Sequence, residues 1–175
     1  MLGKSARSVS ITGHNLVASW RRTWAMQNLI TINKDFAVAK SEPHPEQLKE
    51  FAADGFRSIV NLQPKEEKQK IPEDVERRLA KEAGLTYRHI AVSRNELDSQ
   101  VVEKFRQEVE TLPKPVVVHC ASGKRAGALT MMHVGVTTNQ SGEETLQHAK
   151  AIGFDCDTPQ LANFIRDYVD RARDA

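Results

Sequence analysis

Apolar residues in this chain fall into short blocks separated by longer amphipathic stretches. Two apolar blocks, at 29–32 and 36–39, flank a polar turn and predict a β-hairpin. Segments 56–62, 85–91 and 116–118 predict buried strands, the last because it consists of valine alone. Apolar residues elsewhere recur at helical spacing. The predicted helices cover about 45–54, 72–83, 99–111, 125–137 and 141–151, and a last helix runs from 159 onward.

Residues with a preference for helix ends mark several of these starts. Asp98 or Ser99 is expected to cap the helix that follows it. Ser141 and Glu144 form a capping-box pattern, and Pro72 is expected at the first position of its helix. The charge-rich stretch 65–81 then has the composition of a solvated loop and an exposed helix face.

Strands that alternate with helices indicate crossover connections, which build parallel sheets with helices on both faces. The sequence therefore predicts an α/β fold with a central, mainly parallel sheet of about four to five strands. We expect 116–118 at its centre, because an all-valine strand must be covered on both sides. Reactive sites of such sheets lie at the carboxyl ends of the strands. There, 116–118 leads through a short loop into the helix at 125–137.

Composition limits the class of protein. The chain has 175 residues, 39% of them hydrophobic and 27% charged, which is typical of a soluble domain. A formal charge of +2 favours no nucleic-acid partner. We expect no integral membrane segment, because no window holds the roughly 18 apolar residues that one needs. Two cysteines are too few for a disulfide framework, which favours a reducing compartment such as the cytoplasm.

Positive charge is concentrated at the start of the chain. Residues 1–34 hold five lysines and arginines and no acidic residue. We therefore expect a basic N-terminal extension over 1–27 and a domain over 28–175. The extension has the composition of a poorly ordered leader. An organellar transit peptide or an interfacial amphipathic helix is the alternative, and it would place the protein in an organelle.

The segment after the central strand carries the candidate chemistry. Cys120 stands at the carboxyl end of this strand, followed by a turn of small residues and a helix. The first N–H groups of a helix lack partners and its dipole is positive there, so such a turn binds anions. The positive end of the helix dipole also lowers the pKa of a nearby cysteine and so favours its thiolate form. We expect Cys120 to be a nucleophile that attacks an oxyanion or sulfur centre.

His119 and Cys120, followed by Gly123 and Arg125, resemble the signature loop of cysteine-dependent phosphatases. Two earlier segments point to one family within that group. The first segment is GFRSIVNLQP, at 55–64, with Glu66 shortly after it. The second segment is GLTYRHI, at 84–90. With the loop, they resemble the beta-lactamase-hydrolase-like phosphatase family over about 28–155.

The resemblance implies a dual-specificity-phosphatase-like fold and hydrolysis of phosphate monoesters through a phosphocysteine, with no cofactor. The substrate would be a phosphoprotein or a small phosphorylated molecule. Cys120 would attack phosphorus, and Arg125 would grip two oxygens with its planar fork. Backbone N–H groups of the loop would bind the other oxygens, Gly123 would adopt a positive φ, and His119 would hold the loop. The implied substrate-binding residues are His119, Ala121, Ser122, Gly123, Lys124 and Ala126.

Three features depart from ordinary tyrosine and dual-specificity phosphatases or from this family. Four residues separate Cys120 from Arg125, one fewer than in those phosphatases, and both this family and rhodanese-like sulfurtransferases share the shorter spacing. Ala126 replaces a hydroxyl residue, and Ser122 is either a substitute for that hydroxyl or a turn residue only. Gln63 replaces the family's usual arginine. Two alternatives therefore stay open. One is a sulfurtransferase with a persulfide on Cys120, and the other is a catalytically weak anion-binding module.

A phosphatase also needs a carboxylic acid near the leaving oxygen. Glu96 and Asp98, in the loop after the strand at 85–91, are the candidates, although Asp98 is also the expected helix cap. Glu66 and Glu67 are further candidates. The histidines show no spacing of metal ligands, so we predict no metal. The sequence does not predict an oligomeric state.

Overall fold

The computed structural model describes residues 28–93, 97–154, 156 and 158–175. The expected extension at 1–27 and the candidate acid Glu96 lie outside these residues. Within them, five strands form a sheet in the order β1-β2-β5-β3-β4. The strands are β1 (Leu29–Thr31), β2 (Phe36–Ala39), β3 (Ser58–Asn61), β4 (Thr86–His89) and β5 (Val116–His119). The helices are α2 (Pro45–Ala53), α3 (Glu73–Glu82), α4 (Ser99–Glu110), α5 (Lys124–Thr137), α6 (Gly142–Ala151) and α7 (Pro159–Arg173).

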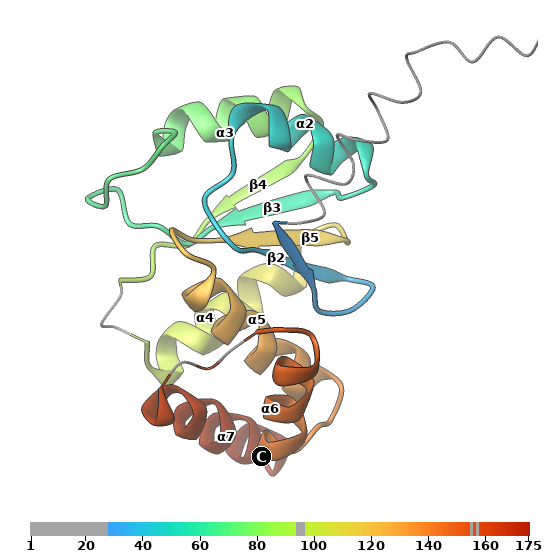
Figure 1. Ribbon diagram of the computed structural model, residues 1–175, viewed down its shortest axis with the longest axis vertical. Coiled ribbons are helices and arrows are strands. Elements are labelled where there is room, and N and C mark those ends of the chain that lie inside the picture. Colours follow the sequence, from blue (N-terminus) through green and yellow to red (C-terminus); the bar gives the residue numbers. More distant parts are fainter. Residues whose placement is uncertain (1–27, 94–96, 155, 157) are drawn as a thin grey trace, which may run out of the picture.

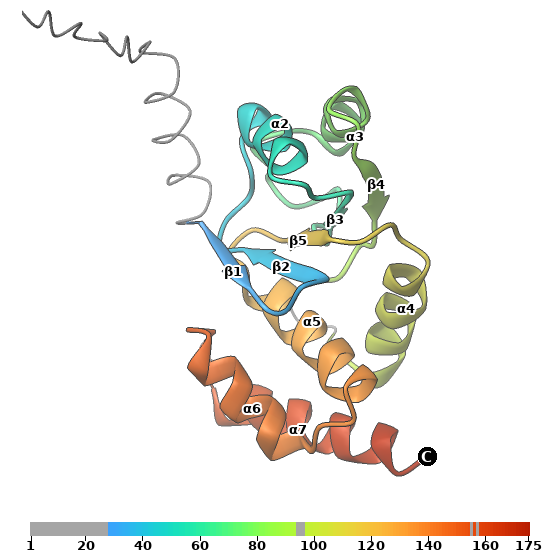
Figure 2. The same cartoon turned by 90° about the vertical axis from the view of Figure 1, so that its right-hand side faces the viewer.

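The fold is α/β, as predicted, with helices on both faces of the sheet (Figure 1). Helices α2 and α3 cover one face, and α4 and α5 cover the other (Figure 2). Helices α6 and α7 form a further layer that packs against α5 (Figure 2). β1 pairs antiparallel with β2, which confirms the hairpin, and all other pairs are parallel.

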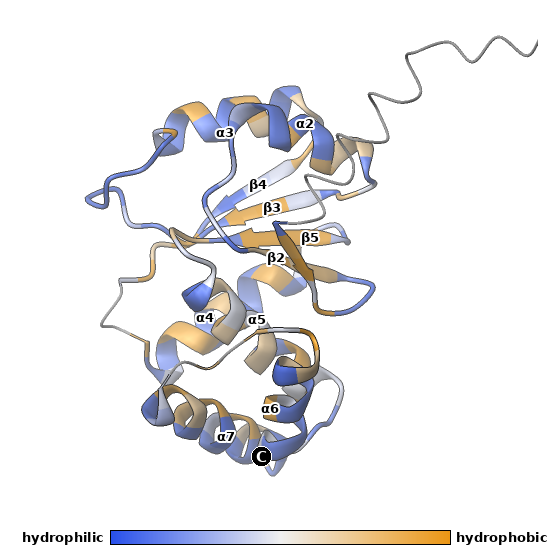
Figure 3. Ribbon diagram, in the orientation of Figure 1, coloured by the Kyte–Doolittle hydropathy of each residue, from blue (hydrophilic) through white to orange (hydrophobic). Residues whose placement is uncertain are grey.

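The central position of β5 is confirmed, since it lies between β2 and β3. Its side chains alternate between the two faces of the sheet. Val116 and Val118 belong to the apolar core under α4 and α5, whereas Val117 packs in the smaller core under α2 and α3. In Figure 3, β5 is accordingly coloured as hydrophobic along most of its length.

Most of the predicted helix starts are confirmed. Asp98 caps α4 with its side chain, and Ser141 forms a capping box with Glu144 at α6. Pro72 was expected at the first helical position but is the residue before it. Its ψ of 143° keeps it extended, so α3 begins one residue later. Among the described residues, no helix has the length and apolar character needed to cross a bilayer.

Candidate active site

The loop between β5 and α5 lies at the carboxyl edge of the parallel strands, where the sequence placed it. Gly123 ends the loop as the N-cap of α5, with a φ of 77°. A Cβ at this position would lie 3.0 Å from the carbonyl oxygen of Ala39 and 3.0 Å from Cα of Lys40. Glycine is therefore needed both for the left-handed backbone and for the close approach to the end of β2.

Cys120 forms the floor of this loop. Its exposed fraction is 0%, and it belongs to the apolar core that includes Val118 and Ala126. Of the other loop positions, Ser122 and Lys124 are exposed at the mouth, Ala121 is half-buried, and Gly123 and Ala126 are buried. Cys120 thus lies buried at the end of β5, in the same apolar cluster as Ala126 of the first turn of α5.

Arg125, in the first turn of α5, is only 9% exposed and is held from two sides. Its Nη1 and Nη2 donate to Oε1 and Oε2 of Glu67 at 2.9 and 2.7 Å. Nη1 also donates to the carbonyl oxygen of Val92. A guanidinium has five N–H groups, and these contacts use three of them. Among the described residues, the Nε–H and the second Nη2–H have no partner, and together they form a planar edge of the kind that grips a phosphate.

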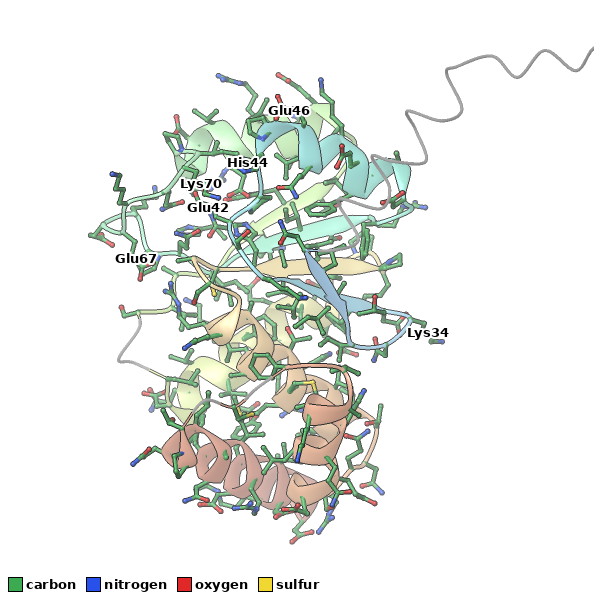
Figure 4. All side chains as sticks on the ribbon, in the orientation of Figure 1. Lys34, Glu42, His44, Glu46, Glu67 and Lys70 are labelled. Carbon is green, nitrogen blue, oxygen red and sulfur yellow. The ribbon has the colours of Figure 1, made fainter. Side chains whose placement is uncertain are left out.

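Glu67 lies in the loop between β3 and α3, on the left of Figure 4. The far end of this loop is tied to the segment between β2 and α2, because Glu42 accepts hydrogen bonds from the backbone N–H groups of Lys70 and Ile71. The sequence offered Glu67 as a candidate acid. The structure instead gives both of its oxygens to Arg125, so Glu67 orients the guanidinium. No local spacing predicts a pair 58 positions apart.

His119 points away from the thiol, toward the face covered by α3. Its Nε2 lies 2.8 Å from Oε1 of Glu76, and both side chains are at most 2% exposed. Oε2 of Glu76 accepts from Nδ2 of Asn61 at 2.7 Å and from the hydroxyl of Tyr87 at 3.2 Å. Glu76 is thus the charged neighbour of His119, although neither imidazole nitrogen has a partner with hydrogen-bond geometry among the described residues, and the loop-holding role of His119 stays a prediction.

The environment of Glu76 corrects one expectation. The stretch 65–81 was expected to be solvated, but Glu73 and Glu76 are 6% and 2% exposed. Burial alone would raise the pKa of Glu76. The nearby imidazole of His119 and hydrogen bonds from Asn61 and Tyr87 outweigh it, so the pKa of Glu76 is lowered from its ordinary value.

Asp98 and Glu96 are the two candidate acids in the loop after β4. Asp98 is exposed, and its Oδ1 accepts from the backbone N–H of Val101 at 2.9 Å, so it caps α4 with one of its two oxygens. Glu96 is outside the described residues.

Gln63, which replaces the family's arginine, is fully buried, and its amide atoms have no hydrogen-bond partner among the described residues.

A cavity of about 360 Å³ adjoins Arg125. Lys124 and Arg125 form its charged side. Its apolar side comes from the loop before α4, from α5 and from the first turns of α7. The apolar lining residues include Leu97, Ala128, Leu161 and Phe164. Its size is that of a small-molecule site, with one cationic and one apolar wall.

Comparison with known proteins gives the family. The model of the family described as "Beta-lactamase hydrolase-like protein, phosphatase-like domain" matches residues 28–154. A curated beta-lactamase hydrolase-like protein from Xylella fastidiosa is 30% identical over 128 residues, which is 73% of this chain and 30% of that protein. One from Agrobacterium fabrum is 28% identical over 127 residues, 72% of this chain and 29% of that protein. The chain thus matches less than one third of the length of these relatives.

Solved structures share the fold. The core of the PP-IP phosphatase Siw14 from S. cerevisiae has a TM-score of 0.63 at 21% identity, covering 81% of this chain and 85% of that one. TpbA from P. aeruginosa, in complex with phosphotyrosine, has a TM-score of 0.65 at 14% identity, covering 86% and 92%. At these identities the likeness is one of fold.

Proposed function

The chain belongs to the family of beta-lactamase hydrolase-like, phosphatase-like domains, and from this premise we propose that it hydrolyses phosphate monoesters through a phosphocysteine on Cys120. The main support for the proposal is the way in which Arg125 is held. Glu67 and Val92 bind its guanidinium in the first turn of α5, five residues after the buried Cys120, and among the described residues its Nε/Nη2 edge has no partner and is available to an oxyanion. A guanidinium held in place before substrate arrives stabilises transition-state charge without reorganising.

The reaction proceeds in two steps. In the first, the thiolate of Cys120 attacks phosphorus, the S–P bond forms, and the ester P–O bond breaks. The leaving oxygen takes a proton from a carboxylic acid, for which Asp98 and Glu96 are the candidates. In the second, water gives a proton to that carboxylate and its oxygen attacks phosphorus. The S–P bond then breaks, and inorganic phosphate and the thiolate are released.

The cavity beside Arg125 supports an aryl ester as substrate. Phosphate would sit at the loop, and the apolar wall that includes Leu161 and Phe164 would contact the ester group. The related folds carry two substrate types, since Siw14 is named a PP-IP phosphatase and TpbA was solved with phosphotyrosine. An apolar wall favours an aromatic group over a second cluster of phosphates.

The test compares the wild-type protein with Cys120→Ser and Cys156→Ser, the second being the matched control for loss of a thiol. Each protein is assayed with an aryl phosphate and, separately, with thiosulfate and cyanide. We expect phosphate release by the wild type and Cys156→Ser and none by Cys120→Ser. Thiocyanate formation without phosphate release would replace the proposal with sulfurtransfer. Binding of vanadate without either reaction would indicate an anion-binding module.

A further inference from the structure

A buried polar cluster lies beneath the cysteine loop, on the face of the sheet covered by α3. Glu76 is its centre and is contacted from three strands, by Asn61 of β3, Tyr87 of β4 and His119 of β5. Asn61 and His119 are 0% exposed and Glu76 is 2% exposed. The reaction described above uses none of these carboxylate contacts, although His119 directly precedes the nucleophile.

The charge of Glu76 influences where a hydrogen sits on His119. With its pKa lowered, Glu76 is ionised at neutral pH, and an ionised carboxylate only accepts hydrogen bonds. Burial raises the pKa of Tyr87, so its hydroxyl remains a donor to Oε2. Nε2 of His119 lies 2.8 Å from Oε1, and this approach favours a hydrogen on Nε2, although neither atom has a partner with hydrogen-bond geometry among the described residues. Glu76 thus acts on His119 through proximity and charge.

The same carboxylate is connected to the loop that holds Arg125. Asn61, which donates to Glu76, also donates to Oε1 of Gln69 at 3.3 Å and accepts from the backbone N–H of Gln63 at 2.7 Å. Gln69 in turn donates to the carbonyl oxygen of Pro64 at 3.0 Å. Asn61 and Gln69 thereby fix residues 63–69, the segment from which Glu67 reaches Arg125.

We propose that Glu76 is a positioning residue for the reaction: it fixes His119 beneath Cys120 and, through Asn61, the loop whose Glu67 orients Arg125. The inference rests on the proposed function of Cys120 and Arg125. Fold stability alone is a weak reason for such a cluster, because apolar side chains of similar volume often replace a buried ion pair without loss of stability. If Glu76 positions both Cys120 and Arg125, its carboxylate has a role in the reaction that an apolar side chain could not fill.

The test uses Glu76→Gln, which keeps the shape and removes the charge, and Tyr87→Phe, which removes one donor. Glu82→Gln, an exposed position on the same helix, is the matched control. Alkylation of Cys120 by iodoacetamide is followed from pH 5 to 9 by mass spectrometry of its peptide, with and without inorganic phosphate. kcat and KM for an aryl phosphate are measured alongside. Other titratable groups near the cluster are Glu73 and Arg77, which pair with each other, and His89, which contacts Gln63.

We expect Glu76→Gln to lower kcat on the order of 100-fold, as a small misplacement of reacting groups does. The pH profile of alkylation should shift, and phosphate should protect Cys120 less. Tyr87→Phe should move the same readouts in the same direction by less, and Glu82→Gln should move none. Adding His119→Gln to Glu76→Gln should cost little more, because coupled residues are not additive.

Profiles of Glu76→Gln and Tyr87→Phe that match the wild type would overturn the inference. If Glu76→Gln does not fold, Tyr87→Phe decides alone, and an unchanged alkylation profile overturns it. Alkylation requires no ester hydrolysis. If the wild type hydrolyses no phosphate ester, the proposed function therefore fails, while the effect of Glu76 on Cys120 is still measured.

Discussion

Glu67 and Arg125, 58 positions apart, form a two-point ion pair in which each carboxylate oxygen accepts from a different guanidinium nitrogen. Their side chains are 18% and 10% exposed, so water screens the pair only in part. The pair fixes the plane of the guanidinium and hence the direction of its remaining Nε/Nη2 edge. Its removal should weaken oxyanion binding without altering the thiol.

Glu67→Gln should therefore lower kcat/KM for an aryl phosphate by about 10- to 100-fold, because hydrogen bonds to charged groups contribute about 1.5–3 kcal/mol. Phosphate should also inhibit more weakly. Steady-state kinetics measures both effects. Glu66→Gln, an exposed neighbour in the same loop, is the control and should behave like the wild type. Equal activity of the two variants would show that the pair does not orient Arg125.

Gly123→Ala should disrupt the loop. A φ of 77° costs an L residue about 1–2 kcal/mol, and the new Cβ would also press on Ala39 and Lys40. Gly153→Ala is the matched control, because its φ is 79° but its Cβ would meet nothing within 4 Å. Both variants should lose stability in urea unfolding, and only Gly123→Ala should lose turnover. Full turnover by Gly123→Ala would mean that the loop tolerates another geometry.

Asp98 can be tested as the acid apart from its capping role, because Asn caps helices about as well as Asp. Asp98→Asn should keep the stability of the wild type. If Asp98 is the acid, turnover of alkyl phosphates should fall by roughly 100-fold or more, since general acids contribute about 10²–10⁴. Aryl phosphates with good leaving groups should be hydrolysed almost normally. Unchanged turnover of alkyl phosphates would remove Asp98 and leave Glu96, with Glu96→Gln as the corresponding variant.

The free energy of unfolding should decrease as the pH falls, because His133 is buried in its neutral form. Burial, with the charges of Arg106 and Lys114, lowers the pKa of His133 from 6.5 to about 4. The unfolded chain therefore takes up this proton first as the pH falls. The stability that neutral His133 provides is complete above about pH 6.5 and is lost between about pH 6.5 and 4, by up to roughly 1.4 kcal/mol per pH unit.

Urea unfolding of the wild type and His133→Phe at pH 7.5 and pH 5 measures this difference. Phenylalanine suits a ring site that already contacts Phe36 and Phe105 edge to face. His133→Phe should lose less stability between the two pH values than the wild type does. His44→Gln, at an exposed position, should lose as much as the wild type. Equal losses in all three proteins would assign the acid sensitivity to other groups.

The sequence predicted those parts of the molecule that depend on local patterns. The valine run of β5, the hairpin and the caps at Asp98 and Ser141 are encoded within a few residues, and the structure contains them. The candidate nucleophile and guanidinium were likewise named from one short loop.

The supporting carboxylates were not predictable in the same way. Glu67 and Glu76 lie in a charge-rich stretch whose composition is that of a solvated surface. Their partners, Arg125 and His119, are brought to them only by the crossovers that place β3 beside β5. A buried charge and an exposed charge have the same letter in the sequence. Only the tertiary fold distinguishes them.

The phosphocysteine proposed on Cys120 can be trapped during turnover. The protein is mixed with an aryl phosphate, denatured within milliseconds and digested, and the masses of the peptides are measured by mass spectrometry. We expect one added phosphate on the sulfur of Cys120 in the wild-type protein while turnover is in progress. Turnover with phosphate on another residue, or with none on the peptide that contains Cys120, would contradict it.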